Sequence, residues 1–200
     1  MRPLFLLLLG AASLAAQPFS FGLKGGVPLT DFIDTVGNNP TLSAIEHPKR
    51  YIVGPEFELR LPWGFAVEVD VLYRRLDYEV VPATAAAVGT SLVTSNDWEF
   101  PALLKYRFAS KGPVRPYVGA GVAFDRLQGL TDTITSAVAG QLKNPGTVGA
   151  VAEGGVDIHF LFLHIAPEIR YTRWTSQHFN LANVLSSNQN QAEFLVGITF

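Results

Sequence analysis

Residues 56–73 read EFELRLPWGFAVEVDVLY, with charged and apolar side chains alternating on both sides of Pro62 and Trp63. A period of two is typical of a β-strand that presents one apolar and one polar face. The break at Pro62 and Trp63 separates the two alternating runs by a tight turn. The stretch therefore predicts two antiparallel strands joined by a short connection, with one uncharged face.

The same alternation recurs along the chain and then stops at intervals. It predicts eight strands, at 18–28, 51–61, 64–78, 96–108, 115–127, 148–160, 162–174 and 192–200. Short turns alternate with long connections, which fall at 30–50, 80–95, 128–147 and 175–191. This alternation of connection lengths is typical of an up-and-down barrel with one short-turn end and one long-loop end.

The two faces of these strands differ in charge. One face is uncharged and rich in Phe, Val, Leu and Ile. The interleaved face carries Lys24, Glu56, Glu58, Arg60, Glu68, Asp70, Glu99, Lys105, Arg107, Glu153, Asp157, Glu168 and Arg170. If the register continues, that face also gains Arg74, Asp125 and Glu193.

The difference in charge between the two faces distinguishes a membrane barrel from a soluble barrel. The interior of a soluble eight-stranded barrel is too narrow for so many apolar and aromatic side chains. In a membrane barrel the apolar face meets lipid, where an Arg or Lys costs roughly 2–4 kcal/mol at mid-membrane, and the charges pair in the lumen. We therefore predict an all-β fold, an eight-stranded antiparallel up-and-down transmembrane β-barrel.

Neighbouring charges in the lumen should pair. Glu168 and Arg170 are two residues apart on one strand, so both should point inward. We expect Glu153 and Asp157 to be partners of Arg170, because an unpaired buried charge is costly. Such a mixed-sign set predicts a charged network that plugs the lumen.

Composition agrees with this fold and excludes several classes of protein. Charged residues make up 16% of the 200 residues, against a typical value of about 25%. The chain contains no cysteine, which excludes disulfides, thiolate chemistry and a lipidated N-terminal cysteine. The net charge of −2 gives no indication of a nucleic-acid partner.

The first segment has the pattern of a secretory signal peptide. Residues 1–16 read MRPLFLLLLGAASLAA, with Arg2 ahead of an apolar run and small residues behind it. We expect cleavage after Ala15 or Ala16, which leaves 17–200 as an exported barrel domain. The apolar run is too short to cross a membrane as a helix.

Aromatic residues are predicted at both ends of the apolar band, as in interfacial girdles. The short-turn end carries Trp63, Phe65, Phe108, Phe160 and Phe200. The long-loop end carries Tyr51, Tyr73, Trp98, Phe124, Tyr171 and Trp174.

With its signal peptide and alternating strands, the sequence resembles the bacterial outer-membrane β-barrel family of the eight-stranded OmpA/OmpX type. The last strand, EFLVGITF at 193–200, adds alternating apolar residues that end in an aromatic: Phe194, Val196, Ile198 and Phe200. The resemblance implies that these residues form the signal read by the barrel assembly machinery. It also implies the bacterial outer membrane as location. The sequence departs from OmpA in that the peptidoglycan-binding domain expected after Phe200 is missing, so wall anchoring is not implied.

Enzymatic and metal chemistry find little support in the sequence. The histidines are His47, His159, His164 and His178, and none lies in an HExxH-type spacing. A hydrolase-like site would need His178 with Ser176, Ser186 or Ser187, residues that are also ordinary in a solvated loop. We expect no catalytic residues, no metal site and no cofactor.

The predicted function is a non-enzymatic outer-membrane barrel with a structural or surface-interaction role. Four long extracellular loops would carry that role on a barrel with a plugged lumen. Two alternatives stay open: a small pore or solute-transport barrel, and an outer-membrane lipid- or peptide-modifying enzyme. The expected partners are outer-membrane lipid, the barrel assembly machinery and an unidentified extracellular partner at the loops. We expect a monomer.

Overall fold

The computed structural model describes residues 18–30, 33–35, 42–46, 51–82, 91–108, 112–128, 146–160, 163–176, 180–181 and 185–200. The predicted signal peptide at 1–16, His47, His178 and parts of all four long connections lie outside these residues. Within the described residues, no helix has the length and apolar character needed to cross a membrane.

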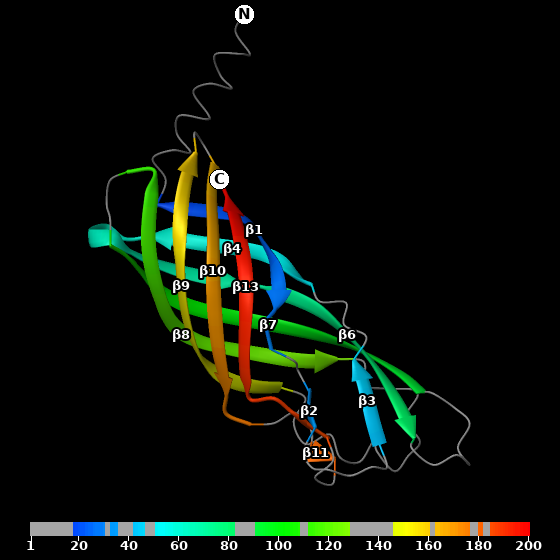
Figure 1. The fold of residues 1–200 in the computed structure, drawn as a ribbon. Helices are drawn as coiled ribbons and strands as arrows, with labels where there is room; N and C mark the ends of the chain where they lie inside the picture. The colour runs from blue at the N-terminus through cyan, green and yellow to red at the C-terminus, as the bar shows by residue number, and fades with distance from the viewer. Residues whose placement is uncertain are drawn as a thin grey trace, which may run out of the picture.

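The chain forms one closed antiparallel barrel, so the predicted fold class is confirmed (Figure 1). Its wall consists of β1 (Phe19–Pro28), β4 (Ile52–Arg60), β5 (Phe65–Asp70), β6 (Leu72–Pro82), β7 (Ser91–Arg107), β8 (Val114–Gln128), β9 (Gly146–Phe160), β10 (Leu163–Trp174) and β13 (Asn190–Thr199). Strand β1 pairs with β4 on one side and β13 on the other, which closes the barrel.

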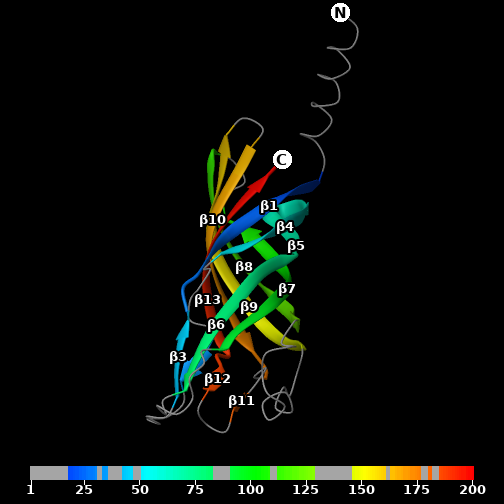
Figure 2. The same cartoon turned by 90° about the vertical axis from the view of Figure 1, so that its right-hand side faces the viewer.

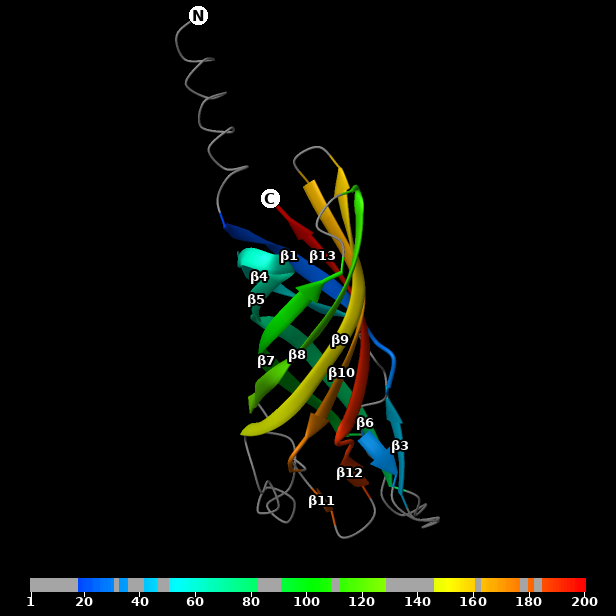
Figure 3. The same cartoon turned by 90° about the vertical axis from the view of Figure 1, so that its left-hand side faces the viewer.

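Shorter elements lie at the two ends of the barrel. A 3-10 turn, η1 (Pro62–Gly64), joins β4 to β5 at the short-turn end. At the long-loop end are β2 (Ile33–Thr35), β3 (Leu42–Glu46), β11 (Asn180–Leu181) and β12 (Leu185–Ser187). Strand β3 pairs with β6, while β11, β12 and β2 form a separate small sheet. Figures 2 and 3 show these elements at the end opposite the C-terminus.

One predicted wall strand, 64–78, is interrupted at Val71 and appears as β5 and β6. Val71 donates its backbone N–H to the carbonyl of Pro55 on β4 at 3.0 Å, but Pro55 has no N–H to return. On the other side, Pro101 of β7 immediately precedes Ala102, the register partner of Val69. Prolines on both flanking strands therefore remove ladder hydrogen bonds at the same level.

The connection predicted at 80–95 is shorter than expected. Strand β6 continues to Pro82 and β7 already begins at Ser91, and the two pair from Leu72↔Glu99 to Val80↔Ser91. The added segments, 79–82 and 91–95, contain Val and Thr, residue types that favour strands. The β6–β7 hairpin therefore extends beyond the length that we assigned to it.

The two faces of the wall point as the parity predicts. Val69 is 42% exposed, whereas Glu68 and Asp70 on either side of it are 0% exposed. None of the residues assigned to the apolar face is buried in the part of the chain that the structure describes. The outside of the barrel is therefore apolar and its inside is charged.

The aromatic girdles form, with one exception. At the loop end the Tyr73 and Trp98 rings lie 5.0 Å apart, and at the short-turn end Phe65 and Tyr106 lie 5.1 Å apart. The assignment of Trp174 to the girdle is wrong. Its side chain is 3% exposed and packs inside the barrel in a cluster with Leu103, Ala123 and Val151. Trp174 is three residues from the outward-facing Tyr171, so strand alternation turns it inward.

Candidate functional site

The centre of the lumen holds a dense group of buried charges. Its cations are Lys24 on β1, Lys105 on β7 and Arg170 on β10. They lie among carboxylates from β4, β5, β9 and β10: Glu56, Glu68, Asp70, Glu153 and Glu168. We call these eight side chains the central cluster.

Glu68 is the hub of the central cluster. Its Oε1 lies 2.6 Å from Lys24 Nζ and 3.0 Å from an Arg170 guanidinium nitrogen. Its Oε2 accepts a hydrogen bond from Lys105. One carboxylate thus holds three cations from three different strands, and this cross-links the barrel wall through its interior.

Arg170 makes an equally dense set of contacts. The same guanidinium nitrogen lies 2.8 Å from Asp70 Oδ2, 2.9 Å from Glu153 Oε2 and 3.0 Å from Glu168 Oε1. The partner that we expected in Glu153 is in place. Asp157, the other expected partner, lies with Arg107 instead.

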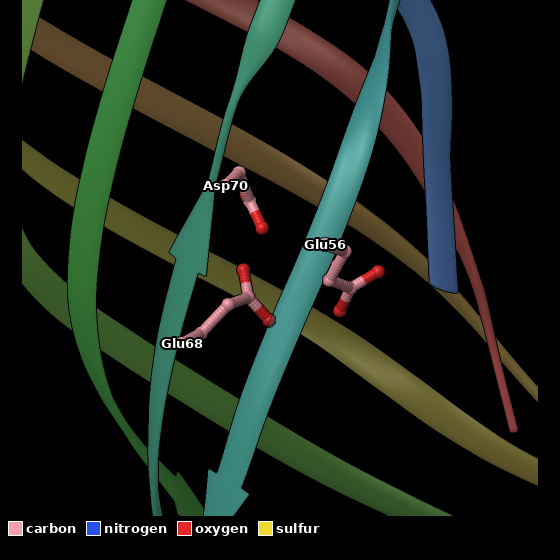
Figure 4. A group of neighbouring side chains, drawn as sticks. All are labelled: Glu56, Glu68 and Asp70. Carbon is pink, nitrogen blue, oxygen red and sulfur yellow. The ribbon is translucent and has the colours of Figure 1, made fainter. Parts of the chain in front are cut away.

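The carboxylate group of Glu56, Glu68 and Asp70 has the spacing of a cation site, with oxygens within 4.8 Å of one another (Figure 4). The ammonium of Lys24 lies 3.7, 2.6 and 3.2 Å from the three residues in turn. A lysine side chain therefore takes the position that a metal ion would need. The related group of Glu68, Glu153 and Glu168 is likewise contacted by the charges of Lys105 and Arg170.

Tyr117 completes the packing of the central cluster. Its hydroxyl donates to Glu168 Oε2 at 2.6 Å, and its ring lies 4.1 Å from Lys105 Nζ. A side chain in place of Gly155 would collide with the Tyr117 hydroxyl at 2.6 Å. This inward glycine therefore provides the space that the large side chain fills.

A second group of charges lies at the short-turn end of the lumen. Arg107 donates to Asp157 Oδ2 at 3.2 Å and also contacts Glu58. Glu58 Oε1 pairs with the partly exposed Arg60 at 3.1 Å. His164 Nδ1 lies 3.0 Å from the other oxygen of Asp157. These residues line the short-turn end of the lumen with paired charges.

A third group lies toward the loop end. The Arg74 guanidinium is 2.6 Å from Asp97 Oδ2, 3.2 Å from Gln191 Oε1 and 3.5 Å from Glu193 Oε1. Glu99 is 4% exposed and makes no hydrogen bond or ion pair with the other described residues. The space between these side chains is too narrow for a water molecule.

Sequence reasoning missed Asp97, Tyr117 and Gln191. The signal that finds them is the same parity, since each lies an even number of residues from an inward charge on its own strand. Asp97 is two residues before Glu99, and Gln191 is two residues before Glu193. Asp97 and Tyr117 lie inside the predicted strands 96–108 and 115–127, and Gln191 lies one residue before the predicted strand 192–200.

The remaining predicted residues are not assembled into a catalytic arrangement in the described part of the chain. Ser176 Oγ lies 2.7 Å from Thr147 Oγ1, and Ser187 is buried. His159 and His164 stack with ring centroids 4.3 Å apart, at the opposite end of the barrel from Ser176. The side chains of Ser186 and His178 lie outside the described residues.

The last strand closes the wall. Phe194, Val196, Ile198 and Phe200 share the outward face, and β13 pairs with both β1 and β10. Their role as an assembly signal stays an implication of the family resemblance.

A closed barrel with an apolar band on its outside and charges inside is the structure of an outer-membrane β-barrel protein. The family described as Outer membrane protein beta-barrel domain matches residues 4–200, and the chain belongs to it. The protein is therefore a bacterial outer-membrane protein.

Solved structures show the same fold. OprG from Pseudomonas aeruginosa is 14% identical, with a TM-score of 0.60 over 90% of this chain and 92% of that one. AlkL is 17% identical, with a TM-score of 0.55 over 92% and 90% of the two chains. No protein with a curated description matches the sequence.

Glu68 and Glu56 are neighbouring carboxylates with different numbers of partners, and this difference leads to a prediction. Glu68→Gln should destabilise the barrel, because it removes the charge that holds Lys24, Lys105 and Arg170. Glu56→Gln should leave stability unchanged or raise it, because Glu56 Oε2 has no hydrogen-bond partner among the described residues and its Oε1 is 3.7 Å from Lys24. Urea unfolding of the two variants in detergent compares the same chemical change at both sites. Equal losses at both positions would contradict the hub role of Glu68.

Proposed function

We propose that the protein is a non-conducting, non-enzymatic barrel whose structural or surface-interaction role is carried by its long-loop end. The observation that carries this proposal is the filled lumen. Lys24, Glu68 and Arg170, which reach inward from three strands, are all 0% exposed. A lumen in which these side chains meet at hydrogen-bond distance leaves no continuous water path at that level.

The long-loop end supplies a framework on which a partner can bind. The β6–β7 hairpin projects there, and β3 pairs along β6 from Leu42↔Pro82 to Glu46↔Tyr78. The small sheet pairs β2 with β12 and so ties the first long connection to the last one. Binding surfaces are commonly built from loops held on a rigid scaffold, and these pairings support that use here.

Planar bilayer recording tests the proposal. The purified barrel should insert without producing conductance steps, because the central cluster blocks the lumen. Stepwise openings of the unmodified protein would instead support the pore alternative, and cation selectivity would follow from the acidic excess of the lumen.

The orientation of the barrel gives a separate prediction. An even number of strands returns the chain to the end where it starts, and in bacterial barrels that end faces the periplasm. An epitope tag inserted between Pro82 and Ser91 should be reachable by antibody on intact cells, whereas a tag at Trp63 should not. Labelling of intact cells at Trp63 alone would reverse the assigned orientation.

A further inference from the structure

The outward face of the barrel carries charge at one end only. Among the side chains that the structure describes, the outward charges are Arg75 on β6, Arg126 on β8 and Arg173 on β10. Arg126 and Arg173 lie at the loop ends of β8 and β10, and Arg75 lies on β6 two residues beyond Tyr73 of the aromatic girdle, as Arg173 lies two residues beyond Tyr171. The outward residues at the short-turn end, among them Phe108, Phe160 and Phe200, are uncharged. The carboxylates whose side chains are described all face the lumen.

Arg173 is held in place by a defined arrangement. It lies opposite Asn190 in the β10–β13 ladder, and its guanidinium donates to Asn190 Oδ1 at 2.7 Å. The same oxygen accepts a hydrogen bond from the Tyr171 hydroxyl at 2.8 Å. The contact to Asn190 uses one guanidinium nitrogen, so an arginine with five N–H donors keeps others for a ligand.

The β6–β7 pair repeats the same pattern almost a hundred residues earlier. Tyr73 donates to Asn96 Oδ1 at 2.8 Å, and Arg75 lies opposite Asn96 in the ladder. Both copies therefore have a Tyr-x-Arg segment on one strand and an Asn opposite the arginine on the next. Because the pattern occurs twice at the same distance from the aromatic girdle, we relate it to the position of these residues in the membrane rather than to local packing.

Arg126 lies on β8, between the strands that carry the two copies. Its register partner on β7 is Trp98, whose ring packs against Tyr73. Arg126 is exposed and makes no hydrogen bond or ion pair with the other described residues. A guanidinium at the edge of a lipid-facing surface, just past the aromatic girdle, lies at the depth of lipid headgroups.

We propose that Arg75, Arg126 and Arg173 form an arginine girdle that binds lipids with a phosphate-bearing headgroup of net negative charge in the leaflet at the loop end. The girdle continues the lipid-facing apolar band, so the molecules that reach it are lipids. The guanidinium of arginine offers two parallel N–H donors that match the geometry of phosphate oxygens. A headgroup of net negative charge also attracts its positive charge. Because the described outward side chains at the short-turn end carry no charge, we expect this binding in one leaflet only.

The test uses the full barrel folded in vesicles of phosphatidylcholine mixed with a minor fraction of phosphatidylglycerol. Lipids that remain bound after extraction into mild detergent are counted by native mass spectrometry. The unmodified barrel should retain phosphatidylglycerol in preference to phosphatidylcholine. The double variant Arg126→Gln, Arg173→Gln should lose this preference by about tenfold, which corresponds to about 1.4 kcal/mol.

The matched control is Arg115→Gln at the short-turn end, where Arg115 donates to the Gly112 carbonyl at 3.2 Å. This control should keep the lipid preference, and a heat-dependent shift on detergent gels verifies that each variant is folded. An unchanged lipid preference in the double variant would overturn the proposal. Full displacement of the retained lipid by inorganic phosphate would overturn it as well, because the girdle would then recognise a free anion rather than a lipid.

Discussion

Arg170→Ala is expected to lower the free energy of unfolding by about 3–5 kcal/mol, the cost of leaving buried charges without their partner. Arg170 is 0% exposed, and one of its nitrogens lies within 3.0 Å of carboxylate oxygens of Glu68, Asp70, Glu153 and Glu168. Removal of the guanidinium leaves these like charges close together with less compensation. Urea unfolding of the barrel in detergent micelles measures the loss.

The control for this prediction is Arg173→Ala, three residues further on the same strand. Arg173 is exposed, so its removal should cost no more than about 1 kcal/mol. A hydrated lumen makes a different prediction, because water would screen the carboxylates around position 170. In that case Arg170→Ala would cost as little as the control and would raise conductance in planar bilayers. Such a result would contradict the plugged lumen.

Val69→Arg is expected to cost roughly 2–4 kcal/mol and to lower the yield of inserted protein. Val69 lies on the outward face of β5, between Phe57 on β4 and Ala102 on β7, within the apolar band. An arginine there would project its charge into hydrocarbon at a depth from which a headgroup is hard to reach. Folding yield into phospholipid vesicles, followed by the gel shift on boiling, measures the effect.

Val69→Leu is the matched control, since it keeps an apolar side chain at the same position and should insert normally. Comparable yields for the arginine and leucine variants would show that position 69 does not contact lipid. The assignment of the two wall faces would then be reversed.

The strands of the barrel wall can be predicted from the sequence, because a strand with lipid on one face and the lumen on the other must alternate apolar and polar residues. The uncharged face around Val69 and the charges at Glu68 and Asp70 are visible in a single line of residues. The same rule gives the inward position of Trp174, which we misplaced by grouping aromatics at strand ends without regard to parity. Local alternation is thus a stronger signal than composition near a membrane boundary.

The pairing of charged side chains inside the lumen can be predicted from the sequence only in part. Glu153 lies directly opposite Arg170 in the β9–β10 ladder, so their contact is set by a neighbouring register. Asp157 instead lies with Arg107, and contacts such as Lys24 to Glu168 cross the lumen. Such contacts depend on the tilt and stagger of the closed barrel, which no single strand encodes.

The alternation of apolar and charged residues also did not predict where the strands end at the long-loop side. Beyond Arg75 the charged residues Asp77 and Glu79 fall on the register of the apolar face, so the contrast between the two faces is lost although the strand continues to Pro82. Strand β3 then pairs with this projecting segment. Hydrogen bonding between backbones, rather than contrast between faces, sustains the sheet there.

The central claim is that one face of every wall strand contacts lipid while the other fills a closed lumen. Because the chain has no cysteine, single cysteines can be placed along β8 at 117, 118, 120, 122, 123 and 124 and spin-labelled, with the gel shift used to retain only folded variants. Gly119 and Gly121 stay unchanged, because a side chain there would collide with Glu153 or with the backbone of Ala102. The measurement is the collision rate of each label with oxygen dissolved in the bilayer. We predict high values at Val118, Ala120, Val122 and Phe124 and low values at Tyr117 and Ala123. A uniform profile, or one with its maxima at Tyr117 and Ala123, would contradict the assignment of the two faces.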